Sequence, residues 1–407
     1  MKKYIFFAII SALLMACDEE SVTKQLNVEE AYESNASVVL KWTNPNISGF
    51  SHYQIMRAYS GGGYSVINDI NDKTSDAYAQ SVTTYTDNSY PLVDSVYYKI
   101  IAIGDEVISS ENICVKVSKP VIFSNQIYKM ASISGTDNVV ATYYDNGYKL
   151  GVIDMDTKSV ETEISISYPS SDDCLSTGVY NGNKELYYWS GHTDKLYIYD
   201  ASTLENIRTT SGYYYFSYPE IVNDANGNIY VFISGSSYFY SYNRTTDSFT
   251  QTYTYQYNYG MRYDSVSNTL GMLGASSIIT YDLSSDGTAT KSKTQTVTES
   301  SSNSYIDGTN LVYQQNTTNT NIYNPNSGEQ NSLNNTINFS KIYYKNGYFY
   351  CTFGTNIIYC YNADTYEFVK KISIRIYVTE LYFSNSYLYY TGSYNGYYII
   401  DRQSLLN

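Results

Sequence analysis

The sequence predicts an all-β protein in which a small β-sandwich precedes a seven-bladed β-propeller. The main observation is a motif in which a short apolar stretch runs into Asp or Asn, followed three residues later by Thr or Ser. It occurs at Asp154–Thr157, Asp200–Thr203, Asn243–Thr246, Asp282–Ser285, Asn324–Ser327, Asn362–Thr365 and Asp401–Ser404, with spacings of 46, 43, 39, 42, 38 and 39 residues. A period near 40 with strand-like content is typical of a repeat architecture.

Each repeat contains the signals of four strands. A β-rich run precedes every motif, and the Asp or Asn side chain favours a tight turn out of that strand. A second turn lies roughly fifteen residues upstream in each unit, as at Asn181–Asn183 and Asn346–Gly347, and opens another β-rich run. No stretch within a unit has helical periodicity. Seven units of four strands predict the propeller, whereas six or eight blades would require one miscounted unit.

The end of the chain predicts how the ring closes. Only Leu405, Leu406 and Asn407 follow the last motif, too few for the outer strand of the last blade. An unfinished blade leaves an open sheet edge. We therefore expect Val115–Phe123, just before the first complete unit, to supply that strand.

The blades resemble those of the YVTN, quinoprotein-like and WD40-like propeller superfamily. Val152–Thr157 and Ile198–Thr203 are similar to the "V-I-D-x-x-T" turn of YVTN repeats. The combination of Gly-His and Trp-Asp that marks true WD40 blades is missing. This resemblance covers residues 125–407 and concerns architecture, so it implies no particular activity.

The amino terminus has the features of an export signal. Met1–Lys3 is basic, and Tyr4–Ala16 is an apolar stretch too short to span a bilayer. Leu14–Cys17 resembles the bacterial lipobox, which implies a signal peptide over residues 1–17, with cleavage before Cys17 and acylation of that residue. Asp18–Glu20, in an acidic linker over residues 18–23, resembles the export tag of surface lipoproteins in Gram-negative bacteria. We expect an outer-membrane lipoprotein exposed on the cell surface; a periplasm-facing anchor is the alternative.

The charge of the mature chain restricts its partners. Removal of Lys2 and Lys3 leaves 23 basic and 39 acidic residues, a net charge of −16. This balance disfavours nucleic acid and anionic membrane surfaces. We expect membrane attachment through the N-terminal lipid only.

Residues 24–118 precede the propeller, which we place at 119–407, and show about seven short strands of an immunoglobulin-like sandwich. The details resemble a fibronectin type III module. Val38–Trp42 is similar to its second strand with the core Trp, Tyr53–Arg57 to the third, Thr84–Asp87 to the fifth and Val96–Ala102 to the sixth. The resemblance implies a spacer.

Catalytic signals are sparse. The chain has two histidines, His52 and His192, which excludes a metal site built from several histidines. No Gly-x-Ser-x-Gly motif accompanies His192. Leu283–Thr288 bears a faint resemblance to the Asp-box of sialidase propellers but occurs once. Asp172 and Asp173 are adjacent carboxylates, and a glycosidase pair or calcium site would need partners from other loops. We expect no catalytic residue, cofactor or metal.

Four cysteines remain besides Cys17. Cys351 and Cys360 flank an expected hairpin turn at Thr355–Asn356. With a two-residue turn, position 351 would pair with position 360 on the neighbouring strand. We expect the two thiols to be neighbours that form a disulfide after export. Cys114 and Cys174 fall in different domains and are not expected to pair.

Tyrosine is the compositional anomaly, with 52 residues against 13 Phe and two Trp. Most should lie in strands, where amphipathic rings suit half-exposed sheet faces. Others fall where loops connect blades. We expect one rim to carry a binding site formed by Trp189, His192, Tyr213, Tyr214, Tyr215, Tyr218, Tyr257, Tyr259, Asp172 and Asp173.

These features predict a non-catalytic, surface-anchored binding protein. Tyr, Ser, Asn and Gly together are favoured in binding loops, and aromatic faces stack on sugar rings. The expected ligand is a glycan or another extracellular polymer, or a protein partner. The alternatives are a polysaccharide lyase or hydrolase with its active site on the rim, and a structural subunit of an envelope complex.

Overall fold

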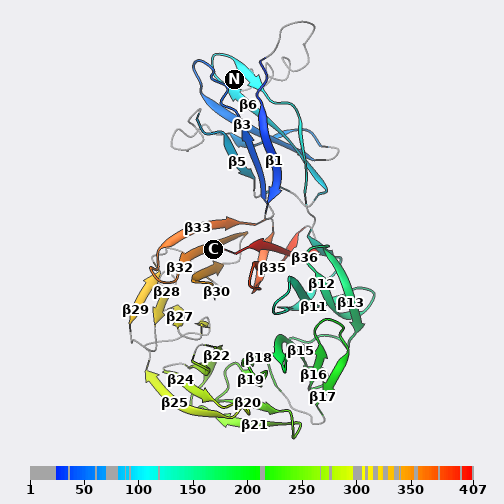
Figure 1. Ribbon diagram of the computed structural model, residues 1–407, viewed down its shortest axis with the longest axis vertical. Helices are drawn as coiled ribbons and strands as arrows, with labels where there is room; N and C mark the ends of the chain where they lie inside the picture. Colours follow the sequence, from blue (N-terminus) through cyan, green and yellow to red (C-terminus); the bar gives the residue numbers. More distant parts are fainter. Residues whose placement is uncertain are drawn as a thin grey trace, which may run out of the picture. The chain divides into compact units, whose positions relative to one another are not determined.

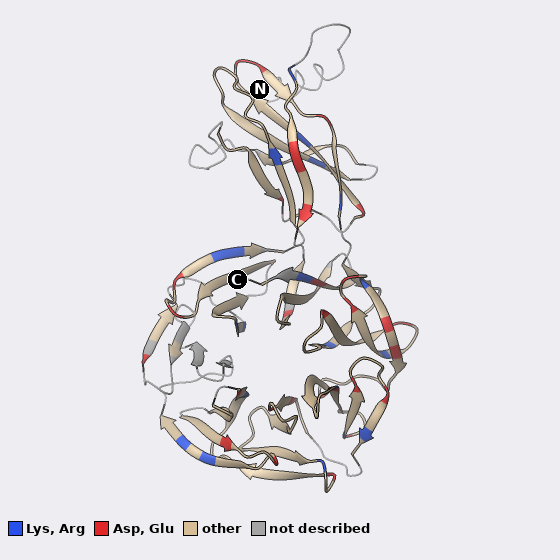
Figure 2. Ribbon diagram, in the orientation of Figure 1, with Lys and Arg blue, Asp and Glu red and all other residues tan. Residues whose placement is uncertain are grey.

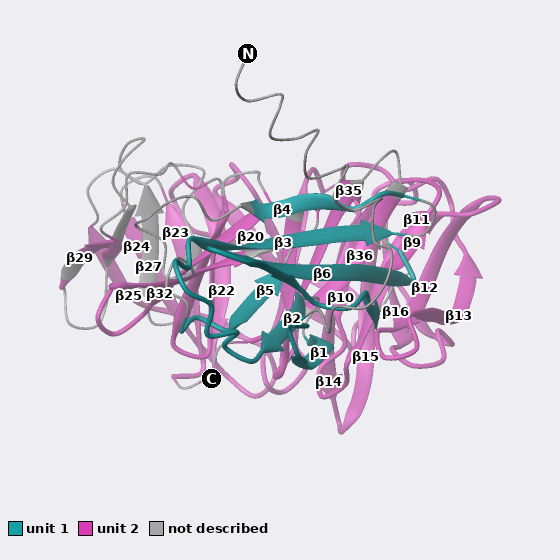
Figure 3. Cartoon of the chain, turned by 90° about the horizontal axis from the view of Figure 1, so that it is seen from above, with its two compact units in different colours: residues 1–87, 93–118 teal, residues 88–92, 119–407 magenta. Residues whose placement is uncertain are grey.

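The computed structural model forms two compact units, one of Met1–Asp87 with Val93–Ser118 and one of Asn88–Leu92 with Lys119–Asn407 (Figure 3). They are called unit 1 and unit 2. The structure describes residues 24–34, 37–59, 62–69, 81–87, 89–90, 93–117, 120–210, 216–265, 267–274, 277–296, 305–307, 310–314, 320–323, 329–333, 339, 341–352, 356–374, 376–394 and 397–405. The expected signal peptide, Cys17 and the acidic linker lie outside these residues. No helix in the described part of the chain is long and apolar enough to cross a membrane.

Unit 1 consists of two antiparallel sheets. Its strands are β1 (Val28–Ser34), β2 (Ser37–Trp42), β3 (His52–Tyr59), β4 (Ser65–Asp69), β5 (Thr84–Asp87), β6 (Ser95–Ile103), β7 (Val107–Ser109) and β8 (Ile113–Lys116). One sheet has the order β1-β2-β5; the other has the order β4-β3-β6-β7, with β8 also paired to β6. Trp42 and Tyr53 are buried, with ring centroids 5.1 Å apart in an edge-on contact.

Unit 2 is built from seven four-stranded antiparallel sheets among the described residues. They succeed one another around a ring (Figure 1). The strands are β9 (Val121–Phe123), β10 (Ile127–Ser132), β11 (Asn138–Tyr144), β12 (Tyr148–Asp154), β13 (Ser159–Ser165), β14 (Cys174–Tyr180), β15 (Asn183–Ser190), β16 (Lys195–Asp200), β17 (Asn206–Thr209), β18 (Pro219–Asn223), β19 (Ile229–Ile233), β20 (Tyr238–Asn243), β21 (Ser248–Tyr253), β22 (Asn258–Asp264), β23 (Thr269–Gly274), β24 (Ser277–Leu283), β25 (Ala289–Thr296), β26 (Tyr305–Asp307), β27 (Asn310–Gln314), β28 (Thr320–Tyr323), β29 (Gln330–Leu333), β30 (Lys341–Lys345), β31 (Tyr348–Thr352), β32 (Ile357–Asn362), β33 (Phe368–Ser373), β34 (Tyr377–Phe383), β35 (Tyr387–Tyr394) and β36 (Tyr397–Ser404).

Within each of the first six sheets the chain runs outward, so that strands such as β13 and β25 lie at the perimeter (Figure 1). The innermost strands of the first six sheets contact one another in succession, from β10 and β14 to β26 and β30, and β10 also contacts β34. The last sheet has the order β34-β35-β36-β9, in which Tyr398 pairs with Phe123 and Ile400 with Val121. The expected closure by a preceding strand is therefore confirmed. The expected start at Val115 is wrong, because Val115 lies in β8 and pairs with Val96 of unit 1.

The repeated motif forms the same turn at four of its seven positions. The side-chain oxygen of Asp154 accepts hydrogen bonds from the backbone N–H of Asp156, 2.6 Å away, and of Thr157, 3.1 Å away. The turns of Asp200, Asn243 and Asn362 repeat this geometry. A residue with positive φ follows each one, namely Lys158, Leu204, Asp247 and Tyr366. This left-handed residue completes a tight hairpin between the third and fourth strands.

Two motif positions behave differently. Asp282 lies within β24, and the turn that follows is organised by Asp286, whose carboxylate accepts the backbone N–H of Thr288 at 3.0 Å. Asp401 lies within β36, is buried, and accepts a hydrogen bond from Lys158 at 3.1 Å. The last sheet takes its outer strand from β9, so no hairpin is needed there. Asn324 lies outside the described residues.

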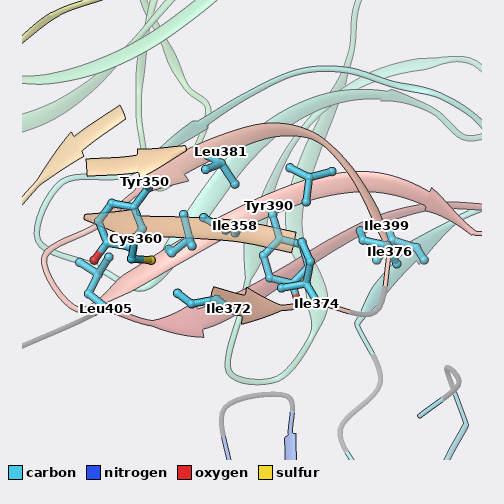
Figure 4. Packing of buried hydrophobic residues seen from close by; sticks show 12 residues of the cluster. Tyr350, Ile358, Cys360, Ile372, Ile374, Ile376, Leu381, Tyr390, Ile399 and Leu405 are labelled. Carbon is cyan, nitrogen blue, oxygen red and sulfur yellow. The ribbon is translucent and has the colours of Figure 1, made fainter. Parts of the chain in front are cut away.

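Apolar clusters fill the spaces between neighbouring sheets. One contains Tyr350, Ile358 and Cys360 of the sixth sheet with Leu381, Tyr390 and Ile399 of the seventh (Figure 4). Second and third strands are buried on both faces, because another sheet packs against each side. Burial of these clusters is the main stabilising contribution to the ring.

The predicted disulfide between Cys351 and Cys360 is wrong. Cys351 pairs with Tyr359, and Cys360 pairs with Tyr350, so the register is shifted by one residue from the expected one. A shift of one residue turns a side chain to the other face of its sheet. Both cysteines are buried and unpaired, and they belong to different interior clusters. Cys114 and Cys174 are also free.

Candidate functional site

The exposed tyrosines of unit 2 gather on one rim of the ring. Among its described residues, the tyrosines with large exposed fractions are Tyr168, Tyr218, Tyr253, Tyr255, Tyr257 and Tyr377. Each lies in, or at the edge of, a connection from the outer strand of one sheet to the inner strand of the next. All such connections open at the same end of the strands, because every sheet has the same up-and-down order. This edge is called the tyrosine rim.

A chain of aromatic rings leads from the interior to this rim between the second and third sheets. Trp189 is fully buried, whereas Tyr255 is 89% exposed. The successive ring centroids are 4.5 Å apart for Trp189–Phe216, 4.7 Å for Phe216–Tyr240, 5.5 Å for Tyr240–Tyr238, 6.0 Å for Tyr238–Tyr253 and 6.4 Å for Tyr253–Tyr255. Separations of this size are typical of favourable aromatic pairs. The exposed rings therefore rest on a packed aromatic support.

Two exposed tyrosines on the rim have an unusual backbone. Tyr218 has φ 49° and Tyr255 has φ 62°, in the left-handed region. A bulky residue is rare there, and such conformations cost on the order of 1–3 kcal/mol. The backbone N–H of Tyr218 donates to Asp172 Oδ1 at 2.8 Å, which fixes this turn. The cost is a reason to seek a role for the two side chains beyond packing.

The carboxylate of Asp173 links two neighbouring segments of the tyrosine rim by hydrogen bonds. Its carboxylate accepts hydrogen bonds from Tyr188 Oη at 2.6 Å, from the backbone N–H of Gly191 at 2.9 Å and from Ser170 Oγ at 3.1 Å. Burial and the charge of Asp173 raise the pKa of Tyr188 far above its ordinary value. The loop that carries His192 is thus anchored to the preceding connection.

The predicted site residues divide into three groups. Tyr218, Tyr257 and His192 are exposed on the rim, and Asp172 and Tyr259 are half-buried there. Trp189 and Asp173 are wrong as ligand contacts, since both are fully buried. Trp189 packs in an apolar cluster, and Asp173 accepts hydrogen bonds inside the protein. Tyr213, Tyr214 and Tyr215 lie outside the described residues.

The sequence reasoning missed a pair of cavities at the opposite ends of the same strands. One has a volume of about 770 Å³ and the other about 560 Å³, and both are bordered by Tyr180, Asn181, Arg244 and Thr245. The sequence predicts only a turn at Asn181–Asn183. The φ values of 49° for Asn181 and 80° for Gly182 are those of a type I′ hairpin, which joins Tyr180 to Asn183.

A buried ion pair lies beside these cavities. Arg244 Nη2 lies 2.6 Å from Glu185 Oε2 and donates to the carbonyl of Gly227 at 3.0 Å. The guanidinium carbon lies 3.8 Å from the centroid of the Tyr180 ring, a cation–π contact. Glu185 belongs to the second sheet and Arg244 to the third, so the pair links two sheets. Arg244 is a basic residue within the repeated turn Asn243–Thr246, and this is the feature of the sequence that could have indicated the ion pair.

Other charged residues are spread over the molecule. Acidic and basic side chains occupy outer strands such as β13 and β25 (Figure 2). In the described residues, no group of three or more His, Cys, Asp or Glu side chains is arranged to hold a metal ion.

No protein-family model matches the chain, and no curated protein matches it. Among solved structures, hydrazine synthase from Kuenenia stuttgartiensis is similar with a TM-score of 0.52 and 14% identity, over 68% of this chain and 95% of that chain. The β-propeller domain of Cps50 (Swd1) from Myceliophteria thermophila has a TM-score of 0.53 and 10% identity, over 70% and 98%. The dihydro-heme d1 dehydrogenase NirN in complex with DHE has a TM-score of 0.48 and 9% identity, over 65% of this chain and 60% of that longer chain.

At these identities the likeness shows the fold alone. Unit 2 is a β-propeller, and the predicted all-β class is confirmed. Propellers serve many unrelated functions, so activity has to be argued from the site.

Proposed function

We propose that the chain is a non-catalytic binding protein whose tyrosine rim holds an uncharged glycan polymer. In this proposal unit 2 is a seven-bladed propeller and unit 1 a fibronectin type III-like spacer. Lipid on Cys17 would anchor the mature chain to the outer membrane, facing the cell exterior. One observation carries the binding role: the exposed tyrosines among the described residues of unit 2 all lie on one rim.

The chemistry of the rim favours an uncharged partner. No charged residue occurs between Ser248 and Met261, the stretch that includes Tyr253, Tyr255 and Tyr257. Tyrosine offers a flat apolar face for a sugar ring and a hydroxyl for hydrogen bonds. It loses little conformational entropy when it is immobilised, which suits a binding surface. A charged polymer would find no complementary groups along this stretch.

The two adjacent carboxylates that the sequence offers for a glycan-cleaving pair, Asp172 and Asp173, are both engaged in the described structure. A lyase or hydrolase of the usual kind places two carboxyl groups around the scissile bond. Asp173 is buried and accepts three hydrogen bonds, and Asp172 holds the backbone of Tyr218. Both carboxylates are thereby committed to positioning the rim. This supports binding over catalysis.

The test is a glycan array probed with the purified chain, followed by titration of each hit. Tyr253→Ala, Tyr255→Ala and Tyr257→Ala should each weaken binding, by about 1–2 kcal/mol for a stacked aromatic residue. Phe368→Ala is the matched control, since Phe368 is 50% exposed on the outer strand β33, away from the rim. Unchanged affinity in all three tyrosine variants would refute the proposal.

A further inference from the structure

The larger cavity described above is a candidate for a second binding site, independent of the tyrosine rim. It lies between the second and third sheets, at the ends of their strands that face away from that rim. Its walls come from three turns: β14–β15 with Asn181, β16–β17 with Glu205, and β20–β21 with Thr245. Its volume of about 770 Å³ falls in the range of small-molecule sites.

The lining combines donors, acceptors and apolar surface. Asn181 and Asn183 contribute amides that both donate and accept hydrogen bonds, Glu205 an exposed carboxylate and Arg208 an exposed guanidinium. Ile207, 52% exposed, adds an apolar face. Hydroxyl groups also both donate and accept, so a ligand rich in hydroxyls matches this mixture.

Charge balance in the cavity disfavours ionic ligands. Among the charged groups of the lining, Arg244 is paired with Glu185, and Asp200 accepts hydrogen bonds from the backbone N–H groups of its own turn, which leaves Arg208 and Glu205. An anion would meet the carboxylate of Glu205 and a cation the guanidinium of Arg208, so either would lose hydration without a net attraction. An uncharged polar ligand avoids this cost.

The floor of the cavity is held rigidly. Arg244 is fixed by Glu185, by the carbonyl of Gly227 and by the ring of Tyr180, and Arg208 Nη1 donates to the carbonyl of Arg244. Four separate contacts therefore hold one turn of the third sheet against the second. A site held by packed and hydrogen-bonded partners loses little entropy when a ligand binds.

We propose that this cavity binds an uncharged mono- or disaccharide, with Asn183 and Glu205 as hydrogen-bonding residues and Ile207 as an apolar contact. The site lies on the opposite rim from the tyrosines, so it does not depend on the function proposed above. A chain with both sites would hold a polymer on one face and a free sugar on the other.

The test is saturation-transfer NMR and calorimetry of the full-length chain with glucose, maltose, cellobiose, sucrose and trehalose, in a detergent without sugar head groups. Glucose 6-phosphate and glucosamine serve as charged probes. We expect at least one neutral sugar to bind, and Asn183→Ala and Glu205→Ala each to weaken this binding about tenfold, as the loss of one hydrogen bond to the ligand predicts. Both residues are exposed, so the variants should fold, which circular dichroism checks.

Phe368→Ala, at an exposed position on the outer strand β33, is the matched control and should leave the affinity for the free sugar unchanged. Loss of sugar binding in Tyr255→Ala, with retention in Asn183→Ala, would place the sugar on the tyrosine rim and overturn the proposal. Absence of binding by all five neutral sugars, or a preference for either charged probe, would also overturn it. Failure of the glycan-array test alone would leave this site standing.

Discussion

Raising the pH should unfold the ring through its buried tyrosines. Burial is the first cause that raises the pKa of Tyr242, Tyr281, Tyr361 and Tyr389 to about 12 each. All four side chains in unit 2 are less than a tenth exposed. An unfolded tyrosine ionises near pH 10. Since the folded pKa lies above the unfolded value, the stabilising contribution is complete below pH 10 and is lost as the pH rises through the folded pKa.

The size of the effect follows from linkage. At about pH 11, a tyrosine with an unfolded pKa of about 10 and a folded pKa of about 12 lowers the free energy of unfolding by about 1.4 kcal/mol. The four tyrosines together remove about 5–6 kcal/mol. A typical domain has a total of about 5–15 kcal/mol, so unit 2 should be close to unfolding at this pH.

Urea denaturation followed by circular dichroism, between about pH 8 and pH 11, measures this loss. Tyr281→Phe is an informative variant, because the Tyr281 hydroxyl is buried without a hydrogen-bond partner in the described structure. It should recover about 1.4 kcal/mol at pH 11 relative to the unmodified chain. Tyr255→Phe, at an exposed position, should recover nothing. Equal stability at pH 8 and pH 11, or ionisation of all tyrosines near pH 10 in the folded protein, would refute the reasoning.

Three further predictions concern the ring and its anchor. Glu185→Ala should destabilise unit 2 by about 3–5 kcal/mol in urea denaturation, because Arg244 is left without its carboxylate, whereas the double variant E185L/R244M should recover most of that loss; equal stability of the two variants would contradict this. Deletion of residues 18–123 should lower the free energy of unfolding by about 3–6 kcal/mol relative to deletion of 18–118, since β9 buries Val121 and Phe123; identical melting of the two truncations would mean that another segment completes the last sheet. Cys17→Ala should move the protein from the membrane fraction to the soluble fraction of fractionated cells, and tight membrane association of that variant would refute the lipid anchor.

The features predicted best were those set by local chemistry. An Asp or Asn followed by a small hydroxyl residue forms its turn from neighbouring backbone groups, so Asp154 and Asn362 could be placed without knowledge of the fold. The repeat period then gave four strands for each unit. Where a strand from a distant part of the sequence pairs with the motif, the Asp or Asn side chain no longer forms this turn. Asp401 has the same motif but remains within a strand, because β9 supplies the neighbouring strand.

The features that failed depend on which face of a strand a residue occupies. Trp189 lies at the end of a strand whose two faces are both covered by other sheets, so a position near a loop did not mean exposure. A two-residue turn would place Cys351 and Cys360 at facing positions, but the observed register differs by one residue and separates them. The cavity beside Arg244 could not be predicted, since it forms between turns of neighbouring sheets that are far apart in the sequence.

The distribution of tyrosine separates residues with a structural role from those of the proposed binding rim. Buried tyrosines have partners for their hydroxyl groups at several points: Tyr143 donates to Glu163 at 2.6 Å, Tyr188 to Asp173 at 2.6 Å and Tyr242 to Asp247 at 2.7 Å. Burial together with these bonds accounts for their presence. Tyr255 has neither advantage. It is 89% exposed and keeps a left-handed backbone that costs stability. Burial gives no reason for an aromatic side chain there, whereas the proposed stacking against a ligand would.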